Sequence, residues 1–102
     1  MTDEKLKKAK RLQEKIKHLK HFLEQYTPLY NQEMQKAMER EDFNLCYNEG
    51  ALVIYLTGPS DASDCVNLEN ELDNDVYKDL YMKIANLIDE KYKKYMAEYS
   101  AL

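Results

Sequence analysis

The sequence of 102 residues has few of the residues that turns and catalytic sites require. It contains two Gly, two Pro, two His and two Cys. The small number of Gly and Pro favours long regular elements over frequent turns. The motifs GxxxxGK[ST], GxGxxG, GxSxG and HExxH are all absent. Since little material is left for a phosphate cradle or a general base, we expect a protein that is not an enzyme and needs no cofactor.

Metal-binding patterns are also missing. Cys46 and Cys65 lie 19 residues apart, outside any CxxC pattern, so reduced thiols are expected. His18 and His21 share a helical face, but no acid or cysteine at helical spacing completes a ligand set. The carboxylates of residues 61–64 and 69–75 lack the EF-hand spacing. We therefore expect no metal site.

The chain has no apolar run of membrane-spanning length and no apolar segment behind its N-terminal charges. A cytoplasmic protein with no membrane partner is the expectation. Charged residues make up 33% of the sequence, more than the usual quarter, which is typical of long solvated helix faces. The length favours one domain, residues 1–102.

Charge is distributed unevenly along the chain. Residues 1–21 hold eight Lys or Arg against three acids, whereas residues 39–79 hold eleven acids against Arg40 and Lys78. The two regions have fields of opposite sign, which is not the composition of a uniformly basic nucleic-acid binder. We do not expect nucleic acid as the partner.

Helical periodicity is strongest at the N-terminus. Thr2 is a candidate N-cap, and acids occupy the first turn. Apolar residues then alternate steps of three and four, which predicts a helix over residues 3–26 with a narrow coiled-coil-like seam. The seam consists of Ala9, Leu12, Ile16, Leu19, Leu23, Tyr26 and Tyr30.

Pro28 interrupts this pattern, because proline lacks a donor N–H and restricts the residue before it. Thr27 and Pro28 resemble the N-cap and first residue of a new helix. We predict a second helix over residues 28–42.

The period changes between residues 43 and 69. The segments FNLCY, ALVIYLT and CVNLE predict a small antiparallel meander, with GPSDASD as a loop. The alternative is that the second helix continues through Gly50 to Thr57, which would give an all-α bundle. A last helix is predicted over residues 74–99. The expected fold class is therefore α+β, with long antiparallel helices and a small sheet.

Tyrosines recur along one side of this last helix, where most should belong to a packing surface. If the first and last helices pair antiparallel, the C-terminal tyrosines lie beside the basic start of the chain. Such a pole could hold an anionic nucleotide by charge and stacking. The candidate ligand-binding residues are Arg11, Lys93, Tyr92, Tyr95 and Tyr99.

The order KLKKAKRLQEKIKHLKHFLEQY, then ALVIYLTG, then VYKDLYMKIANLIDEKYKKYM resembles small helix–hairpin–helix proteins of bacteriophages and prophages. Some members of that group inhibit host defence by binding a defence protein or by sequestering its nucleotide messenger. The resemblance implies that either role deserves consideration here. It assigns no site residue.

Missing catalytic groups and polarised charge together favour a non-catalytic binding or inhibitor protein that occupies a macromolecular partner. The acidic region would face a basic surface of that protein partner through Asp61, Asp64, Glu69 and Glu71. The alternative is a protein that sequesters a small anionic ligand at the basic, tyrosine-rich pole. We also expect a homodimer, because the seam and the tyrosine flank offer more apolar helix surface than one thin sheet can cover.

Overall fold

The computed structural model describes residues 2–40, 52–57 and 63–102. The elements follow the order α1 (Asp3–Tyr26), α2 (Gln32–Glu39), β1 (Val53–Thr57), β2 (Ser63–Asn67), α3 (Leu68–Glu71) and α4 (Asn74–Ser100). The fold class is α+β, mostly helical, with one small antiparallel sheet in the described part of the chain.

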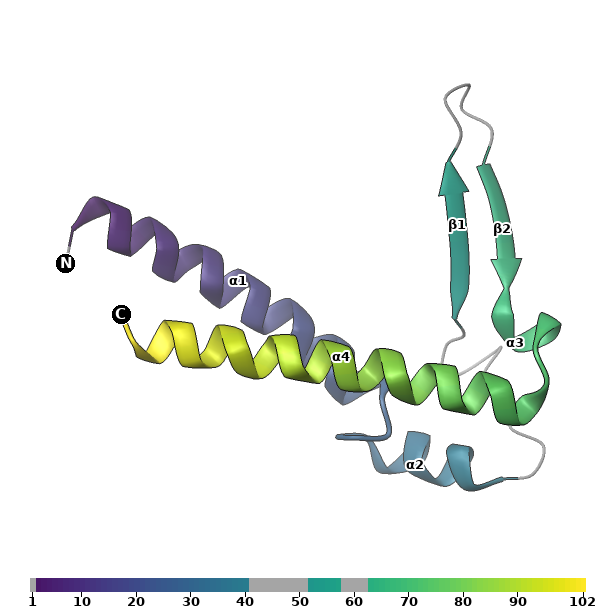
Figure 1. Cartoon of the computed structure of the whole chain (residues 1–102). Coiled ribbons are helices and arrows are strands. Elements are labelled where there is room, and N and C mark those ends of the chain that lie inside the picture. Colours follow the sequence, from purple (N-terminus) through teal and green to yellow (C-terminus); the bar gives the residue numbers. More distant parts are fainter. Residues whose placement is uncertain (1, 41–51, 58–62) are drawn as a thin grey trace.

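The two long helices, α1 and α4, lie antiparallel, so the N- and C-termini meet at one end of the molecule (Figure 1). Helix α2, the sheet and α3 gather around the opposite end (Figure 1). The radius of gyration is 17.0 Å, well above the value of about 13 Å for a compact chain of this length. The paired termini therefore form an elongated projection.

Buried apolar side chains hold the helix pair together. Leu12 and Leu23 of α1 are 4% and 1% exposed, and Tyr81 and Ala85 of α4 are buried as well. Leu12 and Leu23 belong to the predicted three-four seam, so this part of the seam packs within one chain. Its last two members, Tyr26 and Tyr30, stay 41% and 47% exposed.

The start of the second helix differs from the prediction. Thr27 ends α1 instead of capping α2, because its hydroxyl donates to the carbonyl of Leu23 at 2.6 Å. Residues 28–30 form a turn, and Asn31 is the N-cap, accepting from the N–H of Met34 at 3.1 Å. The Asn31 amide also donates to the carbonyls of Glu24 and Gln25. One asparagine thus satisfies both helix ends, and α2 begins at residue 32.

The main core lies where α2 crosses the first half of α4. It consists of Met34, Ala37, Tyr77 and Tyr81, all at most 4% exposed. Half-buried side chains complete it, namely Met38, Leu52, Leu68 and Leu72. Both tyrosine hydroxyls are satisfied: that of Tyr77 accepts from the N–H of Leu52 at 3.0 Å, and that of Tyr81 donates to the carbonyl of Tyr26.

The sheet is a two-stranded antiparallel hairpin that projects away from the helices (Figure 1). Ile54 pairs with Val66 and Tyr55 with Cys65, and all four side chains are exposed. Strand β1 occupies residues 53–57, so the alternative of a continuous helix to Thr57 is wrong, because a β-branched, aromatic run favours the pleated backbone. The predicted strand FNLCY lies outside the described residues. Part of the segment CVNLE belongs to α3, which Asn67 caps.

Leu23→Ala should lower the free energy of unfolding by about 2–5 kcal/mol, because it opens a cavity at a fully buried seam position. The matched control is Leu6→Ala on the same helix, whose side chain is 47% exposed and should cost no more than about 0.5 kcal/mol. Urea unfolding followed by circular dichroism measures both. Equal losses for the two variants would contradict the packing described for α1 and α4.

Candidate functional site

The projecting end of the helix pair carries most of the positive charge. We call residues 2–21 and 89–102 the arm and the rest of the chain the body. The arm holds eleven Lys or Arg against six acids, and the body holds four against thirteen. The formal charges are +5 and −9, so the two ends of one small molecule have opposite fields.

One side of the arm places two lysines on a single tyrosine ring. The ammonium nitrogens of Lys15 on α1 and Lys91 on α4 lie 5.1 and 5.0 Å from the ring centroid of Tyr95. Neither lysine makes an ion pair with a described residue. Cation–π attraction to the half-exposed ring of Tyr95 helps to hold both ammonium groups beside it.

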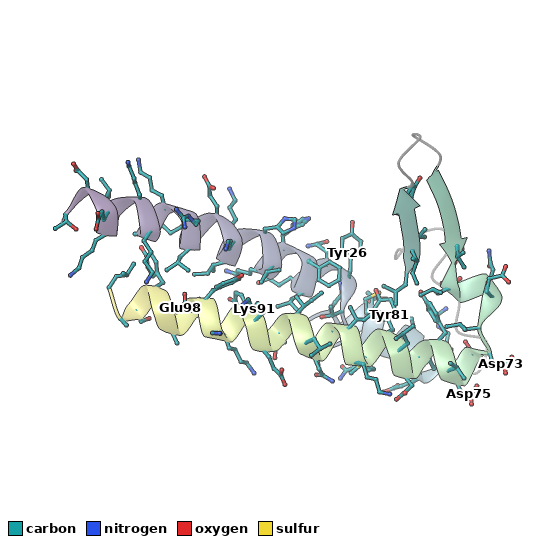
Figure 2. The ribbon with its side chains drawn as sticks, turned by 45° about the horizontal axis from the view of Figure 1, so that its top comes forward. Tyr26, Asp73, Asp75, Tyr81, Lys91 and Glu98 are labelled. Carbon is teal, nitrogen blue, oxygen red and sulfur yellow. The ribbon has the colours of Figure 1, made fainter. Side chains whose placement is uncertain are left out.

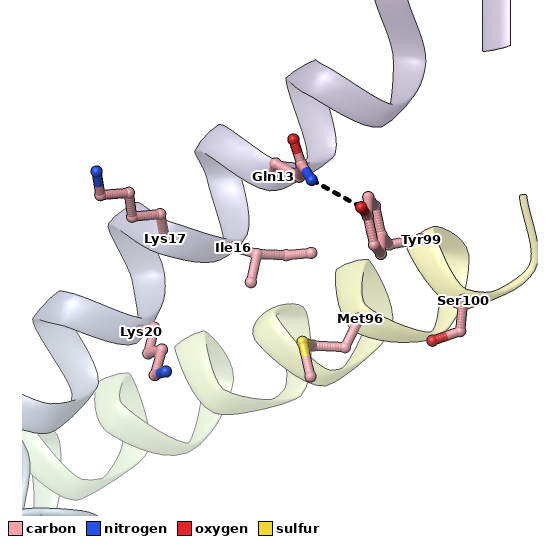
Figure 3. Close-up of a pocket in the computed structure, with 7 residues that line it drawn as sticks. All are labelled: Gln13, Ile16, Lys17, Lys20, Met96, Tyr99 and Ser100. Atoms are coloured by element: carbon pink, nitrogen blue, oxygen red, sulfur yellow. Dashed lines mark hydrogen bonds between the residues drawn. The ribbon is translucent and has the colours of Figure 1, made fainter. Parts of the chain in front are cut away.

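A groove of about 400 Å³ lies between the two helices of the arm (Figure 3). Its lining comprises Gln13, Ile16, Lys17 and Lys20 from α1, and Met96, Tyr99 and Ser100 from α4. The side-chain amide of Gln13 donates to the hydroxyl of Tyr99 at 2.7 Å and spans the two walls (Figure 3). The groove therefore combines an apolar floor with two cationic groups at its edge.

The structure does not gather the five predicted ligand-binding residues into one pocket. Tyr99 lines the groove, whereas Tyr95 contacts Lys15 and Lys91. Lys93 forms an ion pair with Asp89 at 3.0 Å. The other two are Arg11, which is exposed, and Tyr92, which is half-buried.

Helix periodicity explains why the five residues separate. Gln13 and Lys15 contact different tyrosines and are two residues apart, which is about 200° around a helix. Tyr95 and Tyr99 therefore contact different sides of α1. The prediction missed Ile16, Lys17, Lys20 and Met96. Ile16 was already predicted as a seam residue. Lys17 and Lys20 follow it by one and four positions, and this spacing could have indicated a charged edge beside the seam.

The acidic residues predicted to meet a basic partner fall on β2 and α3. Asp61 lies outside the described residues, and Asp64 belongs to β2. On α3, Glu71 is exposed and Glu69 is half-buried. Among these four residues, Glu71 is the one whose side chain is both described and exposed.

Asp89 connects the turn after α1 with the arm. Its carboxylate accepts from the Tyr30 hydroxyl at 2.5 Å and pairs with Lys93. Partial burial acts to raise the pKa of Asp89, but the hydrogen bonds from Tyr30 and Lys93 outweigh it and lower the pKa below its ordinary value. The same hydrogen bond is the main cause that raises the pKa of Tyr30 to about 12. This network fixes the turn to α4.

Other site chemistries find little support in the described residues. No cluster of three or more His, Cys, Asp or Glu in residues 2–40, 52–57 and 63–102 could hold a metal ion. Cys65 is a free, exposed thiol, and Cys46 lies outside the described ranges. None of the helices described is long and apolar enough to cross a membrane. Comparison of the chain with protein-family models, with curated proteins and with solved structures finds no match.

Tyr30→Phe should lower the free energy of unfolding at pH 7 by about 1 kcal/mol or less, because it removes one exposed, charge-assisted hydrogen bond. The difference in the free energy of unfolding between Tyr30→Phe and the original chain should become smaller in two pH ranges. Below the ordinary Asp pKa of 3.8, the unfolded chain binds a proton that the folded carboxylate resists. Between pH 10.0 and about 12, the unfolded chain ionises Tyr30 while the folded chain does not.

Chemical unfolding across the pH range measures this difference. Tyr55→Phe is the control, because the Tyr55 side chain is 69% exposed and makes no hydrogen bond with a described residue, so its change should leave the free energy of unfolding nearly unaltered. A Tyr30→Phe difference that stays constant from pH 2 to pH 12 would contradict the proposed network of Tyr30, Asp89 and Lys93.

Proposed function

We propose that this chain is a non-catalytic binding protein that occupies a macromolecular partner with its arm. The observation that carries the proposal is the groove, where Ile16, Met96 and Tyr99 form an apolar floor beside Lys17 and Lys20. Met96 and Tyr99 remain 44% and 38% exposed at the seam of two helices, where apolar side chains are usually covered. Inhibition of a host-defence protein, which the phage resemblance implies, would be one result of such occupancy.

The chemistry of the groove indicates what would fill it. A furrow between two antiparallel helices accepts a third helix that lays an apolar face along the seam. Lys17 makes no ion pair with a described residue, and the Lys20–Glu24 contact is long, at 4.0 Å. These cations favour acidic side chains on the flank of the incoming helix. The partner is therefore a protein with an exposed, acidic amphipathic helix.

The charge of the whole arm supports the same partner. A formal charge of +5 on a projecting helix pair attracts acidic surfaces before contact and speeds their association. The body, at −9, repels the same surfaces, so the partner is directed to the arm. The earlier assignment of Asp61, Asp64, Glu69 and Glu71 to a basic partner stays a prediction for a second surface.

Lys17→Glu with Lys20→Glu should abolish recovery of the partner in pull-downs quantified by mass spectrometry. Both changes reverse charge at the groove edge. Lys7→Glu with Lys10→Glu is the matched control, because it changes the net charge of the same helix equally but lies outside the groove lining. Binding by the control should fall only modestly, since exposed long-range charge is screened at physiological salt. Equal recovery with both double variants would rule out the groove as the docking surface.

A small anionic ligand is the second candidate, and the pair of lysines on Tyr95 favours it. A phosphate group could bind both ammonium groups while a ring stacks against exposed aromatic surface. This site differs from the one predicted from sequence, because it uses Lys15 and Lys91 in place of Arg11 and Lys93.

A thermal-shift screen with mono-, di- and cyclic nucleotides tests this second candidate. A ligand at 100 times its dissociation constant should stabilise the chain by about 2.7 kcal/mol. Lys15→Ala with Lys91→Ala should remove the shift, and Lys94→Ala, an exposed neighbour without a ring contact, should retain it. No shift with any nucleotide, or a shift that survives the double change, would reject the site.

A further inference from the structure

Helix α4 has a second apolar stripe, which lies outside its buried face. Val76 and Leu87 are 48% and 65% exposed, and Leu80 between them is half-exposed. Steps of four and seven residues place the three within about 40° of one another around a helix. The packed side chains of α4, Tyr77, Tyr81 and Ala85, occupy a different face. The stripe is therefore an uncovered apolar surface on a regular helix.

Charged side chains of both signs lie beside this stripe. Asp73, the N-cap of α4, and Asp79 are exposed, and Lys83 and Lys91 are exposed further along the helix. Figure 2 labels Asp73 at the start of α4 and Lys91 in its second half. The carboxylate of Asp73 makes no ion pair with a described residue. These two acids precede the midpoint of the stripe and the two lysines follow it, so they can pair when two copies of the helix run in opposite directions.

We propose that a second copy of this chain packs antiparallel along the stripe of α4, related by a two-fold axis. The axis passes midway between Val76 and Leu87, so Val76 of each copy lies opposite Leu87 of the other. Antiparallel helices under such an axis bring each flank of the stripe against the same flank of the second copy. The register then sets Lys83 beside Asp79 of the other copy and Lys91 beside Asp73 of the other copy.

The charged residues beside the stripe disfavour a parallel dimer and favour a second copy of this chain over a different protein. A parallel pair would keep the acidic residues Asp73 and Asp79 of one copy at the same height as those of the other, where like charges repel, and would leave the lysines at the far end. The Asp79–Lys83 pair within one helix does not prevent the contact, because its side chains remain 68% and 71% exposed. Self-complementary charge around an apolar centre is what an isologous interface requires. A different protein partner has no reason to match both charge pairs in one register.

The register makes a disulfide test possible. In a background with Cys46→Ser and Cys65→Ser, a chain carrying both Val76→Cys and Leu87→Cys should form a covalent dimer under mild oxidation. The two cysteines cannot bridge within one helix, because 11 residues span about 16 Å, beyond disulfide reach. Each single variant is a matched control: its two symmetry-related cysteines are equally far apart, so it should stay uncrosslinked.

Sedimentation of the original chain supplies a second readout. At micromolar concentration, a species of twice the chain mass of 12.1 kDa is expected, and Leu87→Lys should shift it to the monomer with an unchanged circular dichroism spectrum. Lys83→Glu should weaken the dimer at least tenfold, and adding Asp79→Lys should restore it by reversing the pair. A monomer at every concentration, or a double-cysteine chain that remains uncrosslinked, would overturn the proposal. So would a dimer that survives Leu87→Lys, because the two copies would then associate through a surface other than the stripe.

Discussion

The packing of α1 against α4 is the constraint on which the rest of the structure depends. Leu12 and Leu23 bury their side chains in this seam, and the antiparallel direction brings both chain ends together. The seam thereby places eight cations from the first 21 residues beside three from the last 12. The basic arm, its groove and its separation from the acidic body all follow from this one pairing.

Tyrosines have two roles along α4, divided by position. Near the body, Tyr77 and Tyr81 are buried, and their hydroxyls bond to the backbone of the segments packed on them. In the arm, Tyr95 and Tyr99 keep exposed surface. Tyr95 contacts Lys15 of α1 and Lys91 of α4, and Tyr99 bonds to Gln13 of α1. The change reflects what packs on the helix: α2 and Leu52 at the base of the hairpin cover its first half, whereas α1 is the described element that lies beside its second half. A single residue type is structural at one end and available for binding at the other.

Much of the fold was predictable because long helices repeat their signal over many turns. The three-four spacing of apolar residues predicted α1, and the β-branched run predicted the strand at residues 53–57. The boundary at Thr27 was harder, because Thr27 and Asn31 both have capping side chains and only tertiary contacts decide between them. The candidate site was predicted only to the level of a basic, tyrosine-rich pole. Which residues of α1 meet Tyr95 and which meet Tyr99 depends on the rotation of α1 about its own axis. A pattern of apolar residues defines that rotation too coarsely.

The expected homodimer illustrates the same limit in another way. From the sequence it was expected on the seam and the tyrosine flank, part of which the chain buries internally. The exposed stripe of Val76 and Leu87 lies on another face of α4. Identification as a phage-type inhibitor stays a prediction from the resemblance. The physical features that any such role would use are the groove, the lysine pair on Tyr95 and the charge separation.

The most direct test of the α1–α4 pairing is an isotope-filtered nuclear Overhauser experiment on a mixture of labelled and unlabelled chains. The Lys15 side chain should show contacts with the Tyr95 ring, and the Gln13 amide with the Tyr99 ring. Both sets should arise within one chain, because the seam closes internally. Absence of these contacts, or their appearance only between labelled and unlabelled chains, would contradict the fold from which the arm and its groove are derived.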